Sequence, residues 1–225
     1  MQERTAKILE AAVREFISLG EPISSGFLYR RYSFGIKPAM IRHELEGLSN
    51  RGFLEQPHHS SGRVPTDRGY EFFAERTFEG EGAHEARDKR LAGLFERRAW
   101  DELLEEISSR LGLIGVVSSR KEGLVHKSGL ENLIENLDWE TPEEVKSVIK
   151  DFAAIEDRLD ALSRKLESEA VKVFVGKRSP VTRSRNLAIV AGDYGMGDEE
   201  VLLLAIGPRR MDYRKVFQVF RCFNE

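Results

Sequence analysis

Apolar residues recur with a helical period at the start of the chain. Over residues 5–19 they stand three to four positions apart, which places them on one stripe of a helix. Gly20 follows as the expected stop. Ser24 and Ser25 are typical helix-start residues and predict a short second helix. The apolar residues of the first stripe are Ile8, Leu9, Ala12, Val13, Phe16 and Ile17.

A third helix is predicted to begin at Pro38, because proline is tolerated where its missing N–H would have no intrahelical partner. Ile41, Leu45 and Leu48 recur along one side and define its buried face. Gly52 is the expected stop. The opposite, exposed face gathers Ala39, His43, Glu46 and Asn50, with Arg42 beside it.

The next segment predicts two short strands around a polar turn. Residues 53–54 and 63–65 are the strand candidates, and the turn between them is rich in proline, histidine, serine and glycine. Thr66 and Asp67 then predict the start of a fourth helix. Three helices, a hairpin and a helix, in this order, are typical of a winged helix-turn-helix.

The remainder of the chain predicts a mixed α+β domain. Residues 79–90 have almost no large apolar side chain and mark a boundary, after which residues 91–111 predict one long amphipathic helix that ends at Gly112. Because strands and helices do not alternate regularly, the strands are expected to be mostly antiparallel. The further elements expected are strands at 113–117, 124–126, 171–175, 187–191 and 201–206, and helices within 129–166 and at 213–222.

Three segments result from this pattern. Residues 1–79 are expected to form a winged-helix DNA-binding domain, residues 80–112 a linker and an amphipathic helix, and residues 113–225 a regulatory or dimerisation domain. A length of 225 residues agrees with two small domains. The fold class predicted is therefore α+β, with an N-terminal winged helix-turn-helix followed by a mixed α+β domain.

Charge and composition narrow the class of protein. The formal net charge is −3, which excludes a polycation that coats nucleic acid or an anionic membrane. Residues 23–70 nevertheless hold seven basic and four acidic residues, while the rest of the chain holds 28 and 34. The single cysteine, Cys222, allows no internal disulfide. With no signal-peptide pattern at the start and no apolar run long enough to span a bilayer, we expect a cytoplasmic protein without membrane contact.

Motifs for catalysis, metals and cofactors are incomplete. His43 and Glu44 begin a zinc-protease motif, but Gly47 stands where the second histidine is required. His58 and His59 are adjacent on a turn and have no further ligand nearby in sequence. Residues 195–197 lack the third glycine of a dinucleotide site. We therefore expect no enzyme activity, no metal and no cofactor.

Candidate DNA contacts gather at the start of the third helix, because a helix-turn-helix inserts this end into the major groove. Lys37 is suited to a phosphate, Ala39 to a thymine methyl group, and Arg42 to guanine O6 and N7. His43 is suited to a base or to the backbone. The turn between the strands adds short donors and one cation, and Ser25 opens the second helix towards a phosphate. The turn residues are His58, His59, Ser60, Ser61 and Arg63.

The chain resembles the HrcA family of heat-inducible transcription repressors. The resemblance rests on residues 20–22, on residues 41–45 with Leu48, and above all on residues 52–70, with weaker similarity at 128–133 and 206–213. It implies a homodimeric, winged-helix repressor with a GAF-like second domain, which binds an inverted-repeat operator upstream of chaperone genes. It also implies release by heat and the chaperonin as a partner. DNA contact carries over to Ser25, Arg42, His43 and residues 58–63.

The chain departs from the family in two respects. Lys37 and Met40 stand where the family has Ser or Thr, and His43 stands where it has Asn, so either a different operator sequence or a weaker helix cap is expected. The chain is also shorter than a typical member, and the gap falls between Ser119 and Lys127, where the family has further strands and a dimerisation segment. We therefore expect a reduced GAF-like domain, with the helix over 91–111 and the α+β domain supplying the two-fold contact.

Two other functions stay open on the sequence. One is a regulator that responds to a small molecule bound in the GAF-like domain. The other is a protein interaction module that has lost DNA binding. A mobility-shift assay against the inverted repeat separates the last from a repressor, and a ligand screen separates the first.

Overall fold

A computed structural model describes residues 1–80, 87–119, 121, 123–136, 141–166, 171–197 and 199–223. The chain divides into two compact units, Met1–Arg76 and Thr77–Glu225, which are described separately below. Half of the linker expected over residues 79–90, residues 81–86, lies outside the described residues.

The first three helices of the N-terminal unit follow the sequence signals closely. Helix α1 (Glu3–Leu19) ends at Gly20, whose φ of 75° is readily adopted by glycine. Helix α2 (Ser25–Arg31) is capped by Ser24, whose hydroxyl accepts a 3.1 Å hydrogen bond from the Phe27 N–H. Helix α3 (Pro38–Asn50) buries the predicted stripe, with Ile41, Leu45 and Leu48 all at most 3% exposed. The predictions for these helices are confirmed.

A small hairpin and most of a fourth helix complete this unit, which ends at Arg76 within that helix. Strands β1 (Leu54–Glu55) and β2 (Val64–Pro65) pair antiparallel, and α4 (Asp67–Gly80) follows. The Thr66 hydroxyl accepts a 3.2 Å hydrogen bond from the Gly69 N–H and donates one of 2.7 Å to the Gly52 carbonyl. The end of α3 and the start of α4 are therefore joined at the base of the hairpin.

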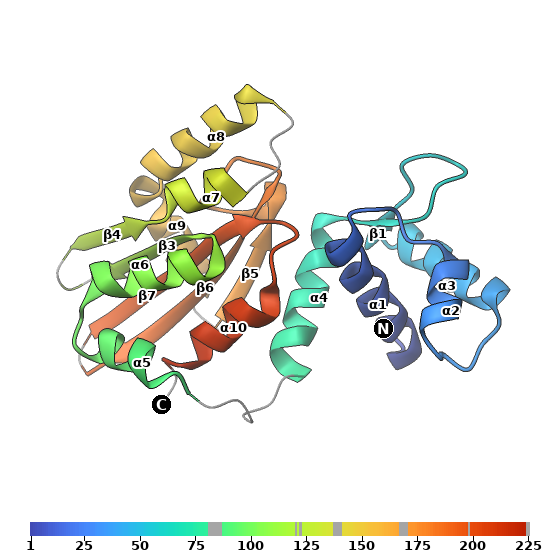
Figure 1. The fold of residues 1–225 in the computed structure, drawn as a ribbon, viewed down its shortest axis with the longest axis horizontal. Helices are drawn as coiled ribbons and strands as arrows, with labels where there is room; N and C mark the ends of the chain where they lie inside the picture. Colours follow the sequence, from blue (N-terminus) through green and yellow to red (C-terminus); the bar gives the residue numbers. More distant parts are fainter. Residues whose placement is uncertain are drawn as a thin grey trace. The chain divides into compact units, whose positions relative to one another are not determined.

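The C-terminal unit is built on one antiparallel sheet in the order β4-β3-β7-β6-β5 (Figure 1). The strands are β3 (Ile114–Ser119), β4 (Leu124–Ser128), β5 (Val171–Val175), β6 (Leu187–Met196) and β7 (Glu199–Pro208). The expected antiparallel pairing is confirmed. Strands β6 and β7 are longer than predicted, because hairpin pairing continues through Asp193, Gly195 and Glu200, where the apolar pattern stops.

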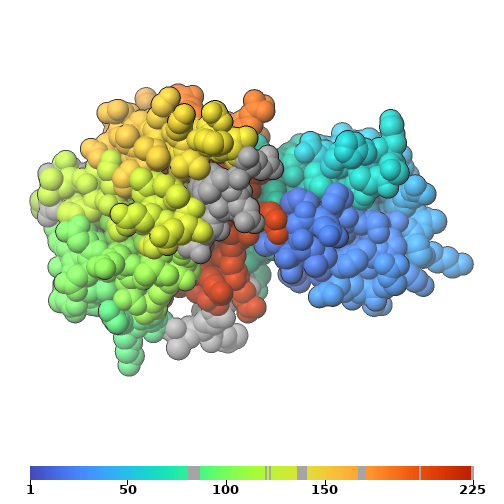
Figure 2. All heavy atoms as spheres, turned by 45° about the horizontal axis from the view of Figure 1, so that its top comes forward, coloured from blue at the N-terminus to red at the C-terminus, as the bar shows by residue number. Residues whose placement is uncertain are grey.

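Helices cover both faces of this sheet, and alternate strand residues show which helix packs on which face. Ile114, Val116 and Ile189 lie in one core with α7 (Leu130–Asn136), α8 (Pro142–Ala153) and α9 (Leu159–Leu166). On the other face Gly115 meets α6 (Trp100–Leu111), and Tyr194 packs on α5 (Lys89–Glu96) and α10 (Tyr213–Arg221). Two 3₁₀ turns, Glu156–Arg158 and Gly176–Arg178, complete the unit. Figure 2 shows α8, in yellow, on its surface.

The single long helix predicted over residues 91–111 is wrong, because the structure breaks it between Glu96 and Trp100. Arg98 adopts a φ of 59° in the break, and its guanidinium lies 2.7 Å from the carboxylate of Glu199, whose side chain is fully buried. The sequence itself indicates this break, because the next position of the apolar stripe holds the charged Arg98.

The apolar stripes of α5 and α6 pack within the chain itself, where Leu91, Leu94, Leu104 and Ile107 are at most 4% exposed. These four side chains therefore have little apolar surface left to bury against a second copy. That residues 91–111 and the rest of the α+β domain supply the two-fold contact stays a prediction.

The segment between Ser119 and Lys127, where the resemblance leads us to expect a gap, lies in a short hairpin. Strands β3 and β4 pair from Gly115 and Ser128 to Ser119 and Leu124, and the N–H of Gly123 donates to the Ser119 carbonyl at 3.0 Å. The turn predicted at residues 121–123 lies in part outside the described residues. No helix in the described part of the chain is long and apolar enough to cross a membrane.

Candidate nucleic-acid interface

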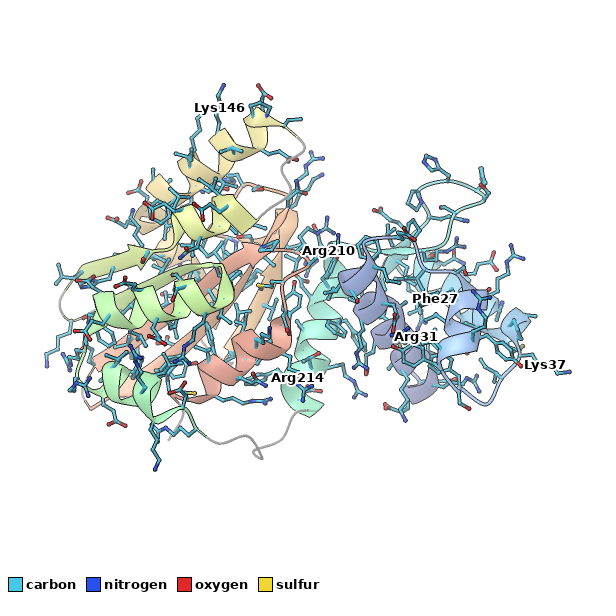
Figure 3. The ribbon with its side chains drawn as sticks, in the orientation of Figure 1. Phe27, Arg31, Lys37, Lys146, Arg210 and Arg214 are labelled. Carbon is cyan, nitrogen blue, oxygen red and sulfur yellow. The ribbon has the colours of Figure 1, made fainter. Side chains whose placement is uncertain are left out.

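Several side chains at the start of α3 are exposed and have no bonding partner among the described residues. Lys37, Ala39, Arg42 and His43 are exposed, while Ile41 between them is fully buried. The side chains of Lys37, Arg42 and His43 form no hydrogen bond or ion pair with any residue that the structure describes. Figure 3 shows Lys37 on the turn before α3, with its side chain directed away from the unit. The structure thus brings these four predicted residues together over two turns.

Glu44 fixes the orientation of α3 against α1. One carboxylate oxygen accepts a 2.9 Å hydrogen bond from the Thr5 hydroxyl, and the other accepts one of 3.0 Å from the Arg4 guanidinium. The Glu44 side chain is only 14% exposed. Burial raises its pKa, but the hydrogen bonds from Thr5 and Arg4 outweigh burial and leave the pKa below its ordinary value. Glu44 is therefore a carboxylate at neutral pH, and it sets how α3 is rotated.

A second buried carboxylate orders the turn between α2 and α3. Glu15 on α1 accepts a 2.6 Å hydrogen bond from the Tyr32 hydroxyl and lies 2.8 Å from the Arg31 guanidinium. Partial burial, and then the hydrogen bond to Glu15, raise the pKa of Tyr32. The Tyr32 ring stacks on Phe34 with centroids 5.6 Å apart. The turn that leads to Lys37 is thereby fixed to α1.

The loop between β1 and β2 is folded on itself by one glutamine and one serine. The side-chain amide of Gln56 donates 2.9 Å hydrogen bonds to the carbonyls of His59 and Ser61. The Ser61 hydroxyl donates to the His58 carbonyl at 2.7 Å and accepts from the His58 N–H at 3.1 Å. Among the candidate contacts, Ser61 therefore shapes the loop, whereas His58, His59 and Ser60 are exposed at its tip.

The base of this loop is bonded to the segment that leads into α2. Ile23 and Arg63 exchange two main-chain hydrogen bonds of 2.9 and 2.8 Å. Gly62 lies so close that an added Cβ would stand 2.5 Å from the Ile23 carbonyl carbon. Ser25, two residues beyond Ile23, and Arg63 are thus brought to the same end of the unit. The Arg63 side chain is partly buried, and its Nε has no hydrogen-bond partner among the described residues.

Two residues in the long segment of resemblance, 52–70, hold the hairpin in place, the exposed Arg68 and the buried Gly69. Arg68 donates a 3.0 Å hydrogen bond to the Arg51 carbonyl, and its guanidinium lies 4.3 Å from the centroid of the Phe53 ring. An added Cβ at Gly69 would stand 2.2 Å from the Phe53 carbonyl oxygen. Sequence reasoning identified the exposed positions but missed Glu44 and Gln56, although both lie within the matching segments.

The residues needed for a metal centre do not come together. In the described part of the chain no three His, Cys, Asp or Glu side chains are grouped as metal ligands would be. The candidate site consists of exposed hydrogen-bond donors and cations on α3 and the β1–β2 loop, which the contacts described above hold in place.

The chain is similar to several known proteins. The family model described as HrcA protein C terminal domain matches residues 71–217. The chain is 45% identical over 75 residues to the heat-inducible transcription repressor HrcA of Moorella thermoacetica, which covers 33% of this chain and 22% of that protein. It is 30% identical over 181 residues to the protein of the same name from Desulfitobacterium hafniense, which covers 76% of this chain and 50% of that protein.

The chain thus spans half or less of the length of these relatives. A crystal structure described only as that of a hypothetical protein has the same fold, with a TM-score of 0.76 at 16% identity, over 100% of this chain and 97% of that one. The family model covers more than half of the chain. The chain therefore belongs to the HrcA family, a family of transcriptional repressors.

Proposed function

We propose that the protein is a sequence-specific DNA-binding repressor of heat-shock chaperone genes, which acts at an inverted-repeat operator and is released by heat. The observation that carries the proposal is the set of exposed, unpartnered donors on the first two turns of α3, Lys37, Arg42 and His43, on a helix held against α1 by Glu44. The family relatives are named as heat-inducible transcription repressors, which supports the same role.

In this proposal the N-terminal unit is a winged helix-turn-helix. Helices α2 and α3 form the helix-turn-helix, and residues 54–65 form the wing. The first turns of α3 enter the major groove, where Arg42 donates to guanine O6 and N7 and Ala39 touches a thymine methyl group. Lys37 and Ser25 bind phosphates, and the wing contributes His58, His59, Ser60 and Arg63. Ser61 contributes through the shape of the loop.

The C-terminal unit is proposed to be a reduced GAF-like domain that holds two copies together in the cytoplasm. A palindromic operator requires a two-fold protein, with half-sites about 34 Å or a multiple of this apart. Because the apolar stripes of α5 and α6 are buried within the chain, the contact belongs to another surface of this unit. Sedimentation of the full chain with and without operator tests the dimer; a monomer in both cases contradicts it. Adding the chaperonin to the binding assay tests that partner.

The experiment for the main proposal is an in vitro selection of duplexes from a randomised library with the full chain, followed by a mobility-shift assay. An enriched inverted repeat, bound more tightly than a scrambled duplex of the same length and released on warming, is the expected result. Recovery of no enriched sequence identifies the chain as a module without specific DNA binding and overturns the proposal. A repeat released by a metabolite but not by heat favours a ligand-responsive regulator instead.

A further inference from the structure

We propose that Gln56 is the positioning residue of the wing: its side-chain amide holds the loop in the shape that carries His58, His59 and Ser60 to DNA. The inference rests on the proposed function and deepens it, because it assigns a separate task to a residue that touches no base or phosphate itself. No recognition role follows for Gln56 from the sequence alone, since glutamine in a polar turn is ordinary.

The geometry of the amide carries the argument. Both hydrogens of the Gln56 Nε2 are directed at main-chain carbonyls, those of His59 and Ser61, at 2.9 Å each. The two acceptors lie on either side of Ser60 in the sequence, so the amide links the two sides of the loop tip. A single side chain thus replaces the main-chain pairing that a longer hairpin would supply at this place, since β1 and β2 have only two residues each.

The rest of the wing is fixed at its other end. The two hydrogen bonds between Ile23 and Arg63, and the close approach of Gly62 to Ile23, hold the returning strand against the start of α2. The Ser61 hydroxyl closes a local turn with His58. The Gln56 amide connects the outgoing strand side of the loop, at the end of β1, to the carbonyls of His59 and Ser61.

Apart from the Gln56 amide, the tip is held only through main-chain groups of His58, which bond to Ser61, among the contacts of the described residues. The side chains of His58, His59 and Ser60 are exposed and form no hydrogen bond with a residue that the structure describes. A loop whose tip moves loses conformational freedom on binding, which costs free energy that a preordered loop does not lose. Removing the amide is therefore expected to weaken binding through the tip, with little effect on the fold, because Gln56 is exposed.

The test uses the full chain and the duplex recovered by in vitro selection, with a scrambled duplex of the same length for comparison. Gln56→Met retains the length of the side chain without its donors, and Gln56→Ala removes both. Gln2→Ala is the matched control, since Gln2 is also exposed and its side chain caps nothing. Each change is made in the parent and in a His58→Ala, His59→Ala background. Hydrogen exchange of residues 57–62 and thermal unfolding are recorded for every variant.

We expect Gln56→Met to weaken binding to the selected duplex about tenfold, equivalent to about 1.4 kcal/mol, and to speed hydrogen exchange at residues 57–62 while the unfolding temperature stays unchanged. In the background without the two histidines the same change is expected to have almost no further effect, because residues that act as a unit are not additive. Gln2→Ala is expected to bind as the parent does.

Equal affinity of Gln56→Met and the parent overturns the inference, as does an equal loss in both backgrounds, since the amide then acts other than through the tip. Parent-like binding by the variant without the two histidines also overturns it. Failure of the parent to select any duplex defeats the proposed function itself, and the two failures are therefore told apart.

Discussion

The Thr5 hydroxyl on α1 donates a 2.9 Å hydrogen bond to the Glu44 carboxylate on α3, the helix whose neighbouring residues Arg42 and His43 face solvent. The bond joins residues that are 39 positions apart in the chain, and it is reinforced by Arg4. Position along α3 therefore decides the surroundings of each side chain: Glu44 bonds to α1, and Arg42 faces solvent, as the proposed DNA contact requires.

Replacing Glu44 is expected to disturb both stability and operator recognition. Glu44→Ala leaves the Thr5 hydroxyl without its acceptor and should lower the free energy of unfolding by about 1.5–3 kcal/mol, the usual contribution of hydrogen bonds to a charged group. Chemical denaturation measures this loss. Thr5→Val should show part of the same effect, and the double variant should lose less than the sum of the two. Strict additivity would show that the two side chains do not interact.

Acid is expected to weaken the same contact. Because the pKa of Glu44 is lower in the folded protein than its ordinary value of 4.5, its contribution to stability is complete above that value. The contribution is lost as the pH falls below 4.5 through the folded pKa. Denaturation curves of the parent and of Glu44→Gln should therefore converge in acid. A difference between them that stays constant over this interval contradicts the assignment.

Arg42→Ala should weaken binding to the selected duplex by about 1–3 kcal/mol and relax the preference for one base pair, as expected for a lost contact to guanine. Arg97→Ala is the matched control, because Arg97 is exposed in the C-terminal unit, away from α3 in sequence. Mobility-shift titrations against base-substituted duplexes measure both effects. If Arg42→Ala keeps the base preference of the parent, Arg42 does not read a base.

Gly62→Ala is expected to displace the wing from the start of α2. The new Cβ would stand 2.5 Å from the main-chain carbonyl carbon of Ile23, a distance shorter than Cβ contacts in real structures. Either the Ile23–Arg63 hydrogen bonds break or the strand shifts, and a loss of about 1–3 kcal/mol in stability follows, as for other overpacked sites. Hydrogen exchange at the Ile23 and Arg63 amides measures whether these hydrogen bonds are lost. Unchanged protection of the two amides would contradict the predicted displacement. Gly47→Ala is the control, since an added Cβ at Gly47 meets nothing within 4 Å.

Arg98→Ala should destabilise the C-terminal unit. The change removes the guanidinium that lies 2.7 Å from the buried Glu199 carboxylate, which keeps the hydrogen bond that the Ser119 hydroxyl donates to its other oxygen. Because Arg98 itself is 37% exposed, we expect a loss of about 1–3 kcal/mol, less than for a fully buried ion pair. Arg98→Lys, which keeps the positive charge, should lose less. Thermal unfolding of the full chain compares the variants. Similar unfolding temperatures for Arg98→Ala and the parent would show that Glu199 is stabilised by other groups.

The sequence predicted local features well and distant pairings poorly. Gly20, Ser24 and Pro38 mark helix ends through their own backbone preferences, so the bounds of α1, α2 and α3 followed directly. The break between α5 and α6 was missed, because an apolar stripe was extended across Arg98, whose partner Glu199 lies a hundred residues further along the chain. The ends of β6 and β7 were missed because pairing, not hydrophobicity, defines them.

The candidate site was predicted in the same uneven way. Exposed positions such as Lys37 and Arg42 follow from the helical period once the buried stripe of α3 is known. The residues that orient them do not, since Glu44 and Gln56 have partners in other elements or across a loop that only the folded chain brings near. From the sequence alone, a polar residue with such a partner is indistinguishable from a polar residue that is simply exposed to solvent.

The two hydrogen bonds between Ile23 and Arg63 have a consequence for how operator preference can change. They join the start of α2 to the hairpin, and the residues that support this arrangement, Glu44 and Gly62, are different from those that face outward. In the proposed repressor, substitutions at Met40 or His43 would therefore change the preferred DNA sequence without removing these supports. Related chains could diverge in their target genes through a few exposed positions alone.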